Sequence, residues 1–339
     1  MVDKGNVLFQ KLLITGGAGY VGHVLTPQLL AKGYHVTVLD KLWYGCRLPN
    51  SPNLRVVKGD IRDAGVVADA VRGQDAVLHL ACISNDASFE LDENLSKTVN
   101  FDCFEPLVVA AKSAGVKRFV YCSSSSVYGV SDSPNVTEEH PLVPLTLYNK
   151  FKGMCEPVLW QHKADDFTCV TLRPATICGY SPRTRLDLSV NILTNHAVNK
   201  GVITVFGGGQ MRPNLHINDM VDAYEMVLEA PAEKIHGQVF NIGFQNHSIA
   251  DLACVVKKVV EEEIPARGPI QITTTPSDDN RSYHVNSDKV HRVLGFQPKR
   301  SIEDAVRDLT RAFRNQLLPD SFDDTWYYNV RTMKRIGAQ

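Results

Sequence analysis

The chain has 339 residues, of which 44% are hydrophobic and 22% charged, and its formal net charge is −1. This is the composition of an ordinary globular protein, long enough for one large α/β unit or two fused lobes. The near-zero charge does not favour nucleic acid or an anionic membrane as a partner, and no apolar stretch reaches the length of a membrane span. Residues 1–10 lack the charged and apolar regions of a signal peptide, so we expect a cytoplasmic protein.

Apolar runs alternate with segments of helical spacing along the first half of the chain. The runs predict strands at 11–15, 34–39, 54–58, 76–80, 118–122 and 168–172. The spacing predicts helices at 21–31, 95–114 and 148–162. Strands that alternate with helices in this way indicate an α/β fold with a Rossmann-type, doubly wound parallel sheet and right-handed crossovers.

The pattern loosens after about residue 175, where loops rich in Pro, Arg and Gly separate shorter elements. We read this part as a smaller lobe that is interleaved with the first. The aromatic and basic C-terminal tail either packs on a neighbour or forms an arm, and the sequence does not decide between them. The predicted units are a Rossmann domain (1–175, with later segments at about 215–245), an α/β substrate lobe (176–317) and the tail (318–339).

The eight cysteines are scattered along the chain and form no CxxC pair. Most of them stand in apolar runs, as Cys122 and Cys169 do. We therefore expect buried free thiols in a reducing compartment, and we expect neither a disulfide nor a metal site.

A glycine-rich finger, Gly16-Gly17-Ala18-Gly19-Tyr20-Val21-Gly22, follows the first predicted strand and opens a helix. Glycines there allow a tight turn and let backbone amides approach a pyrophosphate at the helix N-terminus. Asp40, followed directly by Lys41, ends the second predicted strand, where a carboxylate hydrogen-bonds the adenosine ribose and repels a 2′-phosphate. NAD is therefore favoured over NADP. Asp60-Ile61, after the third strand, either meets the adenine or caps the next helix.

Tyr148 and Lys152 stand four residues apart in a predicted helix, so they share one face of it. A nearby ammonium stabilises a phenolate and lowers the phenol pKa, which predicts an acid/base group that works near neutral pH. The glycine finger and the serine cluster Ser123–Ser126 stand upstream of this pair. Their presence in this order strengthens the prediction that the pair is catalytic.

Together these residues resemble the extended short-chain dehydrogenase/reductase family of NAD-dependent nucleotide-sugar epimerases and dehydratases, over roughly residues 10–315. Further markers are His79-Leu80-Ala81, Asn100, Ser123–Gly129, Arg173-Pro174 and His216–Asp219. The resemblance implies tightly bound NAD and a nucleotide-sugar substrate. It also implies that Tyr148 is the acid/base and that Lys152 holds the nicotinamide ribose and lowers the Tyr148 pKa.

The resemblance implies further site residues. Ser124 would hydrogen-bond the reacting sugar hydroxyl, and Leu80, Ala81 and Cys82 would pass along the cofactor. The other residues expected at the substrate are Ser84, Asn191, Arg212 and Arg281, with the two arginines as a pyrophosphate clamp or as plain surface residues. Family members pair through the helices that correspond to 95–114 and 148–162, so we expect a homodimer.

Several reactions that members of the family catalyse can be excluded for this chain. Dehydratases of the family carry an Asp-Glu pair where this chain has Ser125-Ser126, and 3,5-epimerases need a cysteine where Ser126 stands. The loop 178–185 lacks the lysine of heptose 6-epimerases. We therefore expect 4-epimerisation through a 4-keto intermediate, with a 4-dehydrogenase or 4-keto reductase as the alternative.

The substrate is not predicted beyond its class. Residues 82–88 and Thr176 depart from the pattern expected of UDP-galactose epimerases, so neither the nucleotide nor the sugar follows from the sequence. The synthesis of surface-polysaccharide precursors is an expectation from the family alone. A non-catalytic NAD-binding sensor is a further alternative, which the intact Tyr148, Lys152 and Ser124 disfavour.

Overall fold

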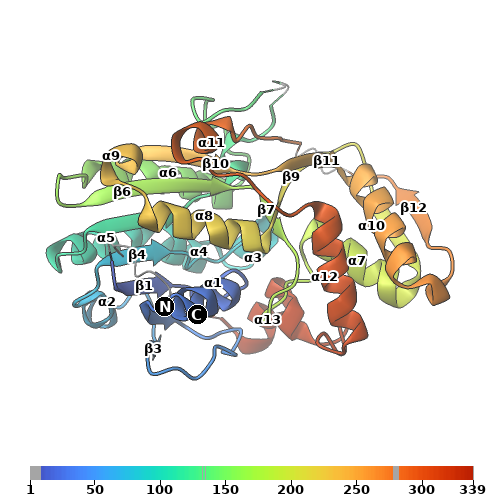
Figure 1. The fold of residues 1–339 in the computed structure, drawn as a ribbon, viewed down its shortest axis with the longest axis horizontal. Coiled ribbons are helices and arrows are strands. Elements are labelled where there is room, and N and C mark those ends of the chain that lie inside the picture. The colour runs from blue at the N-terminus through green and yellow to red at the C-terminus, as the bar shows by residue number, and fades with distance from the viewer. Residues whose placement is uncertain (1–8, 132, 134, 278–281, 339) are drawn as a thin grey trace, which may run out of the picture.

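A seven-stranded parallel sheet in the order β10-β6-β5-β4-β1-β2-β3 forms the centre of the computed structural model, which describes residues 9–131, 133, 135–277 and 282–338 (Figure 1). Its strands are β1 (Lys11–Thr15), β2 (His35–Asp40), β3 (Leu54–Lys58), β4 (Ala76–His79), β5 (Arg118–Cys122), β6 (Thr168–Pro174) and β10 (Gln238–Ile242). The predicted Rossmann-type fold is confirmed. The strand order reverses between β1 and β4, which is where ligands bind in such sheets.

Both faces of the sheet are covered by helices. In β1, Leu12 and Ile14 pack in one core cluster with α1 (Gly22–Ala31) and α8 (Ile217–Glu229). Leu13 packs on the opposite face, in a cluster with α2 (Ala64–Val71), α5 (Phe104–Ser113) and α6 (Leu147–Gln161). Because both faces are buried, the strands read as continuous apolar runs rather than as alternating ones.

The remaining helices lie against the large sheet, in the second lobe and in the C-terminal tail. They are α2 (Ala64–Val71), α3 (Asp86–Phe89), α4 (Glu93–Lys97), α5 (Phe104–Ser113), α6 (Leu147–Gln161), α7 (Ser189–Lys200), α9 (Ala232–Ile235), α10 (Ile249–Glu263), α11 (Asp288–Leu294), α12 (Ile302–Arg314) and α13 (Asn329–Ile336).

The helical segment predicted at 95–114 contains a π-turn at Thr98–Asp102, between α4 and α5. Asn100 lies in this turn and is buried. Its Oδ1 accepts from the Ile83 amide at 2.8 Å and its Nδ2 donates to the Ile83 carbonyl at 2.9 Å. The turn thus ties the helix to the loop that follows β4, at the edge of the site described below. Helical spacing alone does not predict such a turn.

The second lobe is built from α7, α10 and α12, which pack on one another around one hydrophobic cluster. It also holds a parallel pair, β8 (Val202–Phe206) and β12 (Gln271–Thr275), to the right in Figure 1. A three-stranded sheet of β7 (Thr176–Cys178), β9 (Met211–His216) and β11 (Gln245–Ser248) lies between the lobe and the large sheet (Figure 1). The second half of the chain also supplies β10 and α8 to the large sheet.

The C-terminal tail packs on its own chain. Leu318, Tyr327 and Tyr328 join Leu186 and two residues of α12 in a buried cluster. The Leu186 amide donates to the Tyr327 carbonyl at 2.9 Å. This packing places α13 beside the loop that precedes α7, between the sheet and the second lobe (Figure 1).

Two further expectations concern the membrane and the thiols. Across the described residues, no helix combines the length and the apolar character needed to cross a membrane. Among the cysteines, which are all free, Cys103, Cys155, Cys169 and Cys178 are buried. Cys82 and Cys122 are partly buried, and Cys46 and Cys254 are exposed, so the prediction of buried thiols holds for four of the eight cysteines.

Candidate active site

A cavity of about 360 Å³ lies at the carboxyl ends of the central strands, where the strand order reverses. All residues expected along the cofactor line it: Gly16, Gly19, Tyr20, Val21, Gly22, Asp40, Lys41, Asp60, Ile61, Leu80, Ala81, Cys82, Tyr148 and Lys152. Ser84 and Ser124 line it as well. The structure therefore brings these residues together, while their individual contacts with a cofactor stay predictions.

The glycine finger forms a tight cradle at one side of this cavity. Gly16 has a φ of +72°, and a Cβ on it would lie 2.6 Å from the Ala81 backbone nitrogen. A Cβ on Gly22 would lie 2.3 Å from the Gly17 carbonyl oxygen. Both positions therefore require glycine. The cradle keeps the start of α1 close to the cavity, as the pyrophosphate of a dinucleotide requires.

Acidic residues mark the end of the cavity where an adenosine ribose would bind. The Asp40 carboxylate accepts from the Ala18 amide at 3.0 Å and from the Leu42 amide at 2.8 Å. Asp60 pairs with Lys41 at 2.8 Å and with Arg62 at 2.7 Å. Although burial opposes ionisation, the bonds from Arg62 and Lys41 hold the pKa of the Asp60 carboxyl far below its ordinary value. The finger thus meets a carboxylate where NAD-dependent proteins place one.

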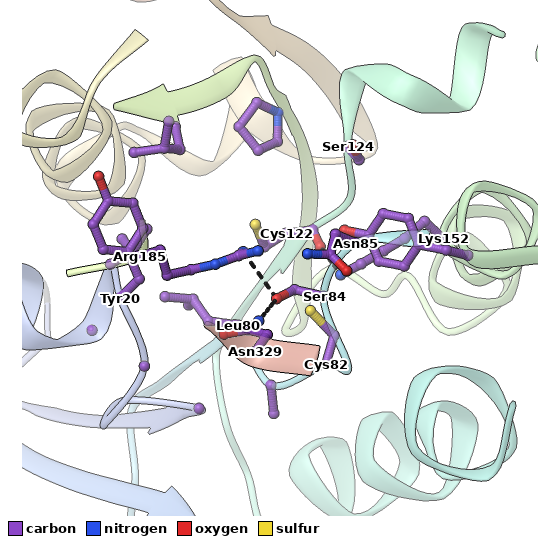
Figure 2. A pocket seen from close by; sticks show the side chains of 18 of the residues that line it. Tyr20, Leu80, Cys82, Ser84, Asn85, Cys122, Ser124, Lys152, Arg185 and Asn329 are labelled. Carbon is purple, nitrogen blue, oxygen red and sulfur yellow. Dashed lines mark hydrogen bonds between the residues drawn. The ribbon is translucent and has the colours of Figure 1, made fainter. Parts of the chain in front are cut away.

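The three residues expected to be catalytic line the same cavity. Ser124 and Lys152 lie across it from Tyr20 of the glycine finger (Figure 2). Helix α6 begins after Thr146, which caps the Asn149 amide, and this places Tyr148 in the first turn. Lys152 follows one turn later, is buried, and donates from Nζ to the Cys122 carbonyl at 2.7 Å. The Ser124 Oγ lies 2.7 Å from the Ser126 Oγ.

The pKa of Tyr148 is raised, not lowered. Burial raises it well above the ordinary value of 10, the thiols of Cys82 and Cys122 add to this, and Arg185 opposes it. The pKa that was expected to be lowered is therefore raised in this structure, because the cost of burying a phenolate outweighs the attraction of the Arg185 cation. Sequence spacing reports which groups share a helix face but not how much water reaches them.

A buried ionic network connects α6 to the large sheet. Glu156, one turn after Lys152, accepts from the Arg173 guanidinium at 2.6 and 3.0 Å and from the Ser123 hydroxyl at 2.7 Å. Arg173 also donates to the Tyr128 hydroxyl at 2.7 Å. The network therefore joins the helix that carries the Tyr–Lys pair to the ends of β5 and β6.

A second cavity, of about 380 Å³, continues from the first. The residues that line both are Asp86, Ser126, Asn149, Thr176, Leu188 and Tyr283. Arg212 lines the second cavity, and its guanidinium lies 5.6 Å from the ring centre of Tyr283. Arg281 lies outside the described residues. The two cavities together form one path from the cofactor end into the second lobe.

Asn191 is not brought to either cavity. It is completely buried at the start of α7. Its Oδ1 accepts from the Gly179 amide at 3.0 Å, and its Nδ2 donates to the Tyr20 hydroxyl at 3.1 Å and to the Arg185 carbonyl at 2.8 Å. In this structure Asn191 holds the loop after β7 against the finger.

Arg183, Arg185 and Asn329 are among the residues of the cavity wall that were not identified from the sequence. The signal for the arginines is the Pro-Arg-Thr-Arg stretch of the loop after β7, where two cations stand close together. Asn329 lies in the tail, 245 residues from its partner Ser84, and no local pattern marks it.

Comparisons with known proteins agree with this geometry. A model of the NAD-dependent epimerase/dehydratase family matches residues 12–243. A UDP-glucose 4-epimerase of Lactobacillus helveticus is 30% identical over 323 residues, covering 87% of this chain and 94% of the relative. Among solved structures, DesIV, a dTDP-glucose 4,6-dehydratase from Streptomyces venezuelae with NAD bound, has 26% identity and a TM-score of 0.79 over 91% of this chain and 98% of its own. MoeE5 in complex with UDP-glucuronic acid and NAD has 25% identity and a TM-score of 0.78 over 90% and 99%.

Proposed function

Because the chain belongs to the NAD-dependent epimerase/dehydratase family, we propose that it inverts the configuration at C4 of a sugar carried by a nucleotide. It is an NAD-dependent nucleotide-sugar enzyme of the extended short-chain dehydrogenase/reductase type. One observation carries the C4 assignment: the reacting end of the cavity holds Tyr148, Lys152 and Ser124, while serines stand where a dehydratase needs its acid and base.

The side chains at this end have complementary tasks in the proposed reaction. NAD, when bound, supplies a hydride acceptor that also returns the hydride. Tyr148 takes the proton of the C4 hydroxyl and returns it after the 4-keto sugar has rotated in the site to present its opposite face. Ser124 orients that hydroxyl, and Lys152 holds the nicotinamide ribose beside it. Arg185 lowers the pKa of Tyr148 against the effect of burial, and so favours the base form.

The positions that follow Ser124 argue against elimination of water. Ser125 is buried, and the Ser126 hydroxyl donates to the Asn149 side-chain oxygen. Neither serine can act as a carboxylate acid or base. A carboxylate does lie on the shared wall, Asp86, and it accepts from the Thr146 hydroxyl at 2.6 Å.

A nucleotide-sugar 4-dehydrogenase or 4-keto reductase is the alternative, because each transfers a hydride at C4 in one direction only: the first from the sugar to NAD, the second from NADH to a 4-keto sugar. In neither reaction does the hydride return to the same sugar. A non-catalytic sensor would need none of the three reacting side chains, and all three line one cavity.

The second cavity suits the nucleotide part of the substrate. Arg212 offers a planar guanidinium for phosphate oxygens, and we assign the same role to Arg281. Phe206 offers an exposed ring on which a base can stack. DesIV is a dTDP-glucose 4,6-dehydratase and MoeE5 binds UDP-glucuronic acid, so a pyrimidine nucleotide is proposed here. A role in the supply of surface-polysaccharide precursors is proposed from the family alone.

The direct test is turnover of UDP-, dTDP-, CDP- and GDP-linked sugars by the protein as purified, with the products read by NMR. We expect one of them to be converted to its C4 epimer without added cofactor, because NAD stays bound through the cycle. A substrate-dependent rise in NADH absorbance without an inverted sugar would instead establish the 4-dehydrogenase.

We also propose that the protein is a homodimer that pairs through α5 and α6. Val109 of α5 and Met154 of α6 are 43% and 37% exposed, and such apolar side chains on a helix pair suit an interface. Sedimentation velocity at micromolar concentration should give the mass of two chains. Met154→Glu should shift it towards one chain, and a single-chain mass for the unmodified protein would contradict the proposal.

A further inference from the structure

Two arginines of the loop between β7 and α7 are buried in the wall of the first cavity. Arg183 is 1% exposed and Arg185 is 8% exposed. Among the described residues, no hydrogen-bond partner is found for Nε and Nη1 of Arg183 or for Nη2 of Arg185. A buried donor without a partner costs about 1–3 kcal/mol, and more when it is charged. Groups of this kind call for an acceptor that the described part of the protein does not supply.

Two carboxylates, Asp187 and Asp40, interact electrostatically with the pair, and they leave several guanidinium N–H groups without an acceptor. Arg185 Nε bonds Asp187 at 2.9 Å, which neutralises one guanidinium. Arg183 instead stacks on Tyr44, at 4.1 Å from the ring centre, and donates to the amide oxygen of Asn329. Burial and the neighbouring charge of Arg185 lower the pKa of Arg183 to about 10. What the site lacks is an acceptor for these N–H groups, and the oxygens of an anion can provide it.

The position of the arginines identifies the anion. Their loop rests on the glycine finger, where the Ser181 hydroxyl donates to the Tyr20 carbonyl at 2.8 Å and the Tyr20 hydroxyl donates to the Gly179 carbonyl at 2.6 Å. Arg183 lies towards Asp40, with which it interacts electrostatically. The arginines are therefore held opposite the start of α1.

Arg185 extends in the other direction, towards the reacting end. It donates from Nη1 to the Ser84 hydroxyl at 3.1 Å (Figure 2), and its charge opposes the rise in the pKa of Tyr148. The pair thus stands between the carboxylate that marks the adenosine ribose and the tyrosine that marks the reacting sugar. The middle of a dinucleotide that runs between these points is its pyrophosphate.

We propose that Arg183 and Arg185 bind the pyrophosphate of the NAD cofactor from the second lobe, across the cavity from the glycine finger. Guanidinium N–H groups form strong, charge-assisted hydrogen bonds with phosphate oxygens, and Nε and Nη1 of Arg183 and Nη2 of Arg185 have no acceptor in the described part of the protein. The cofactor is then held on one side by backbone amides and on the other by two cations. Such a clamp keeps the cofactor in place between half-reactions.

Asn329 of the tail is the positioning residue of this clamp. Its Oδ1 accepts from Arg183 Nη2, its Nδ2 donates to the Ser84 hydroxyl at 2.9 Å, and its backbone amide donates to Asp187 at 3.0 Å. It therefore connects both arginines, directly or through their partners. The tail therefore forms part of the wall of the cofactor cavity.

The test is a binding measurement without substrate, after any copurified nucleotide has been removed. ADP-ribose carries the pyrophosphate and adenosine lacks it. We expect Arg183→Gln and Arg185→Gln each to raise the Kd for ADP-ribose at least tenfold and to change that for adenosine less than twofold. Asn329→Ala should raise the Kd for ADP-ribose several-fold. Arg335→Gln, an exposed arginine of α13, is the matched control and should change neither value.

A second experiment distinguishes the pyrophosphate of the cofactor from that of the nucleotide-sugar substrate. Calorimetry with UDP should show no change in the arginine variants, because the proposed site belongs to the cofactor. A tenfold weaker binding of UDP with unchanged ADP-ribose binding would assign the arginines to the substrate and overturn the proposal. So would an ADP-ribose Kd within twofold of the unmodified protein in both variants.

Hydrogen exchange of the unmodified protein makes the test independent of how the variants fold. ADP-ribose, but not adenosine, should slow amide exchange in residues 179–188 and in α13. Equal exchange with both ligands would overturn the proposal. Because no sugar is present in these measurements, their failure would leave the C4 assignment standing, and failure of the C4 assignment would leave the clamp standing.

Discussion

Replacement of Tyr148 by phenylalanine is expected to lower the turnover of the nucleotide sugar by about 10²–10⁴-fold, the usual contribution of a positioned acid/base. The phenol is the one group of the proposed mechanism that both takes and returns the C4 proton. The ring stays in place at the start of α6, so packing is preserved. The Kd for ADP-ribose should therefore change less than about threefold, while kcat falls.

The matched control is Tyr34→Phe, which removes a hydroxyl far from the cavity, where it donates to Glu229 at 3.4 Å. Its turnover should stay within twofold of the unmodified protein. Full turnover by Tyr148→Phe would remove the acid/base assignment. It would leave the chain as a family member that uses another proton carrier.

Replacement of Glu156 by alanine is expected to lower the free energy of unfolding by about 3–5 kcal/mol. Both partners of the Glu156–Arg173 pair are buried, with side-chain exposures of 0% and 4%. Alanine would leave the guanidinium of Arg173 without its carboxylate in a site that water does not reach. Equilibrium denaturation in urea measures the change, and turnover should fall as well because the network positions α6.

A surface pair provides the comparison for this effect. Lys97 and Asp102 lie 2.7 Å apart, but their side chains are 46% and 40% exposed. Asp102→Ala should therefore change the unfolding free energy by less than about 1 kcal/mol. If Glu156→Ala cost no more than Asp102→Ala, the buried network would not hold the helix as described.

The parts of the fold that follow local patterns could be predicted from the sequence. The six strands predicted in the first half of the chain all occur, because an apolar run bounded by glycines or polar residues has few alternatives in an α/β protein. The finger and Asp40 could be assigned for the same reason, since spacing along one βαβ unit defines their geometry. The π-turn around Asn100 could not, because it depends on the backbone of a distant loop.

The rest of the site depends on contacts between distant segments. Arg183 and Asn329 meet although 146 residues separate them, so no window of sequence indicates the clamp. The expected lowering of the Tyr148 pKa failed because burial is a property of the folded chain. Asn191 was expected at the substrate phosphates, yet its amide is used inside the protein on the loop after β7.

The central claim is that the hydride leaves C4 of the sugar and returns to the opposite face of the same carbon. The most direct measurement uses the nucleotide sugar that the panel identifies, labelled with deuterium at C4, and follows the label by NMR. We predict that the C4 epimer forms with the deuterium still on C4. Loss of the label from the sugar, or its appearance in free NADH, would contradict the account.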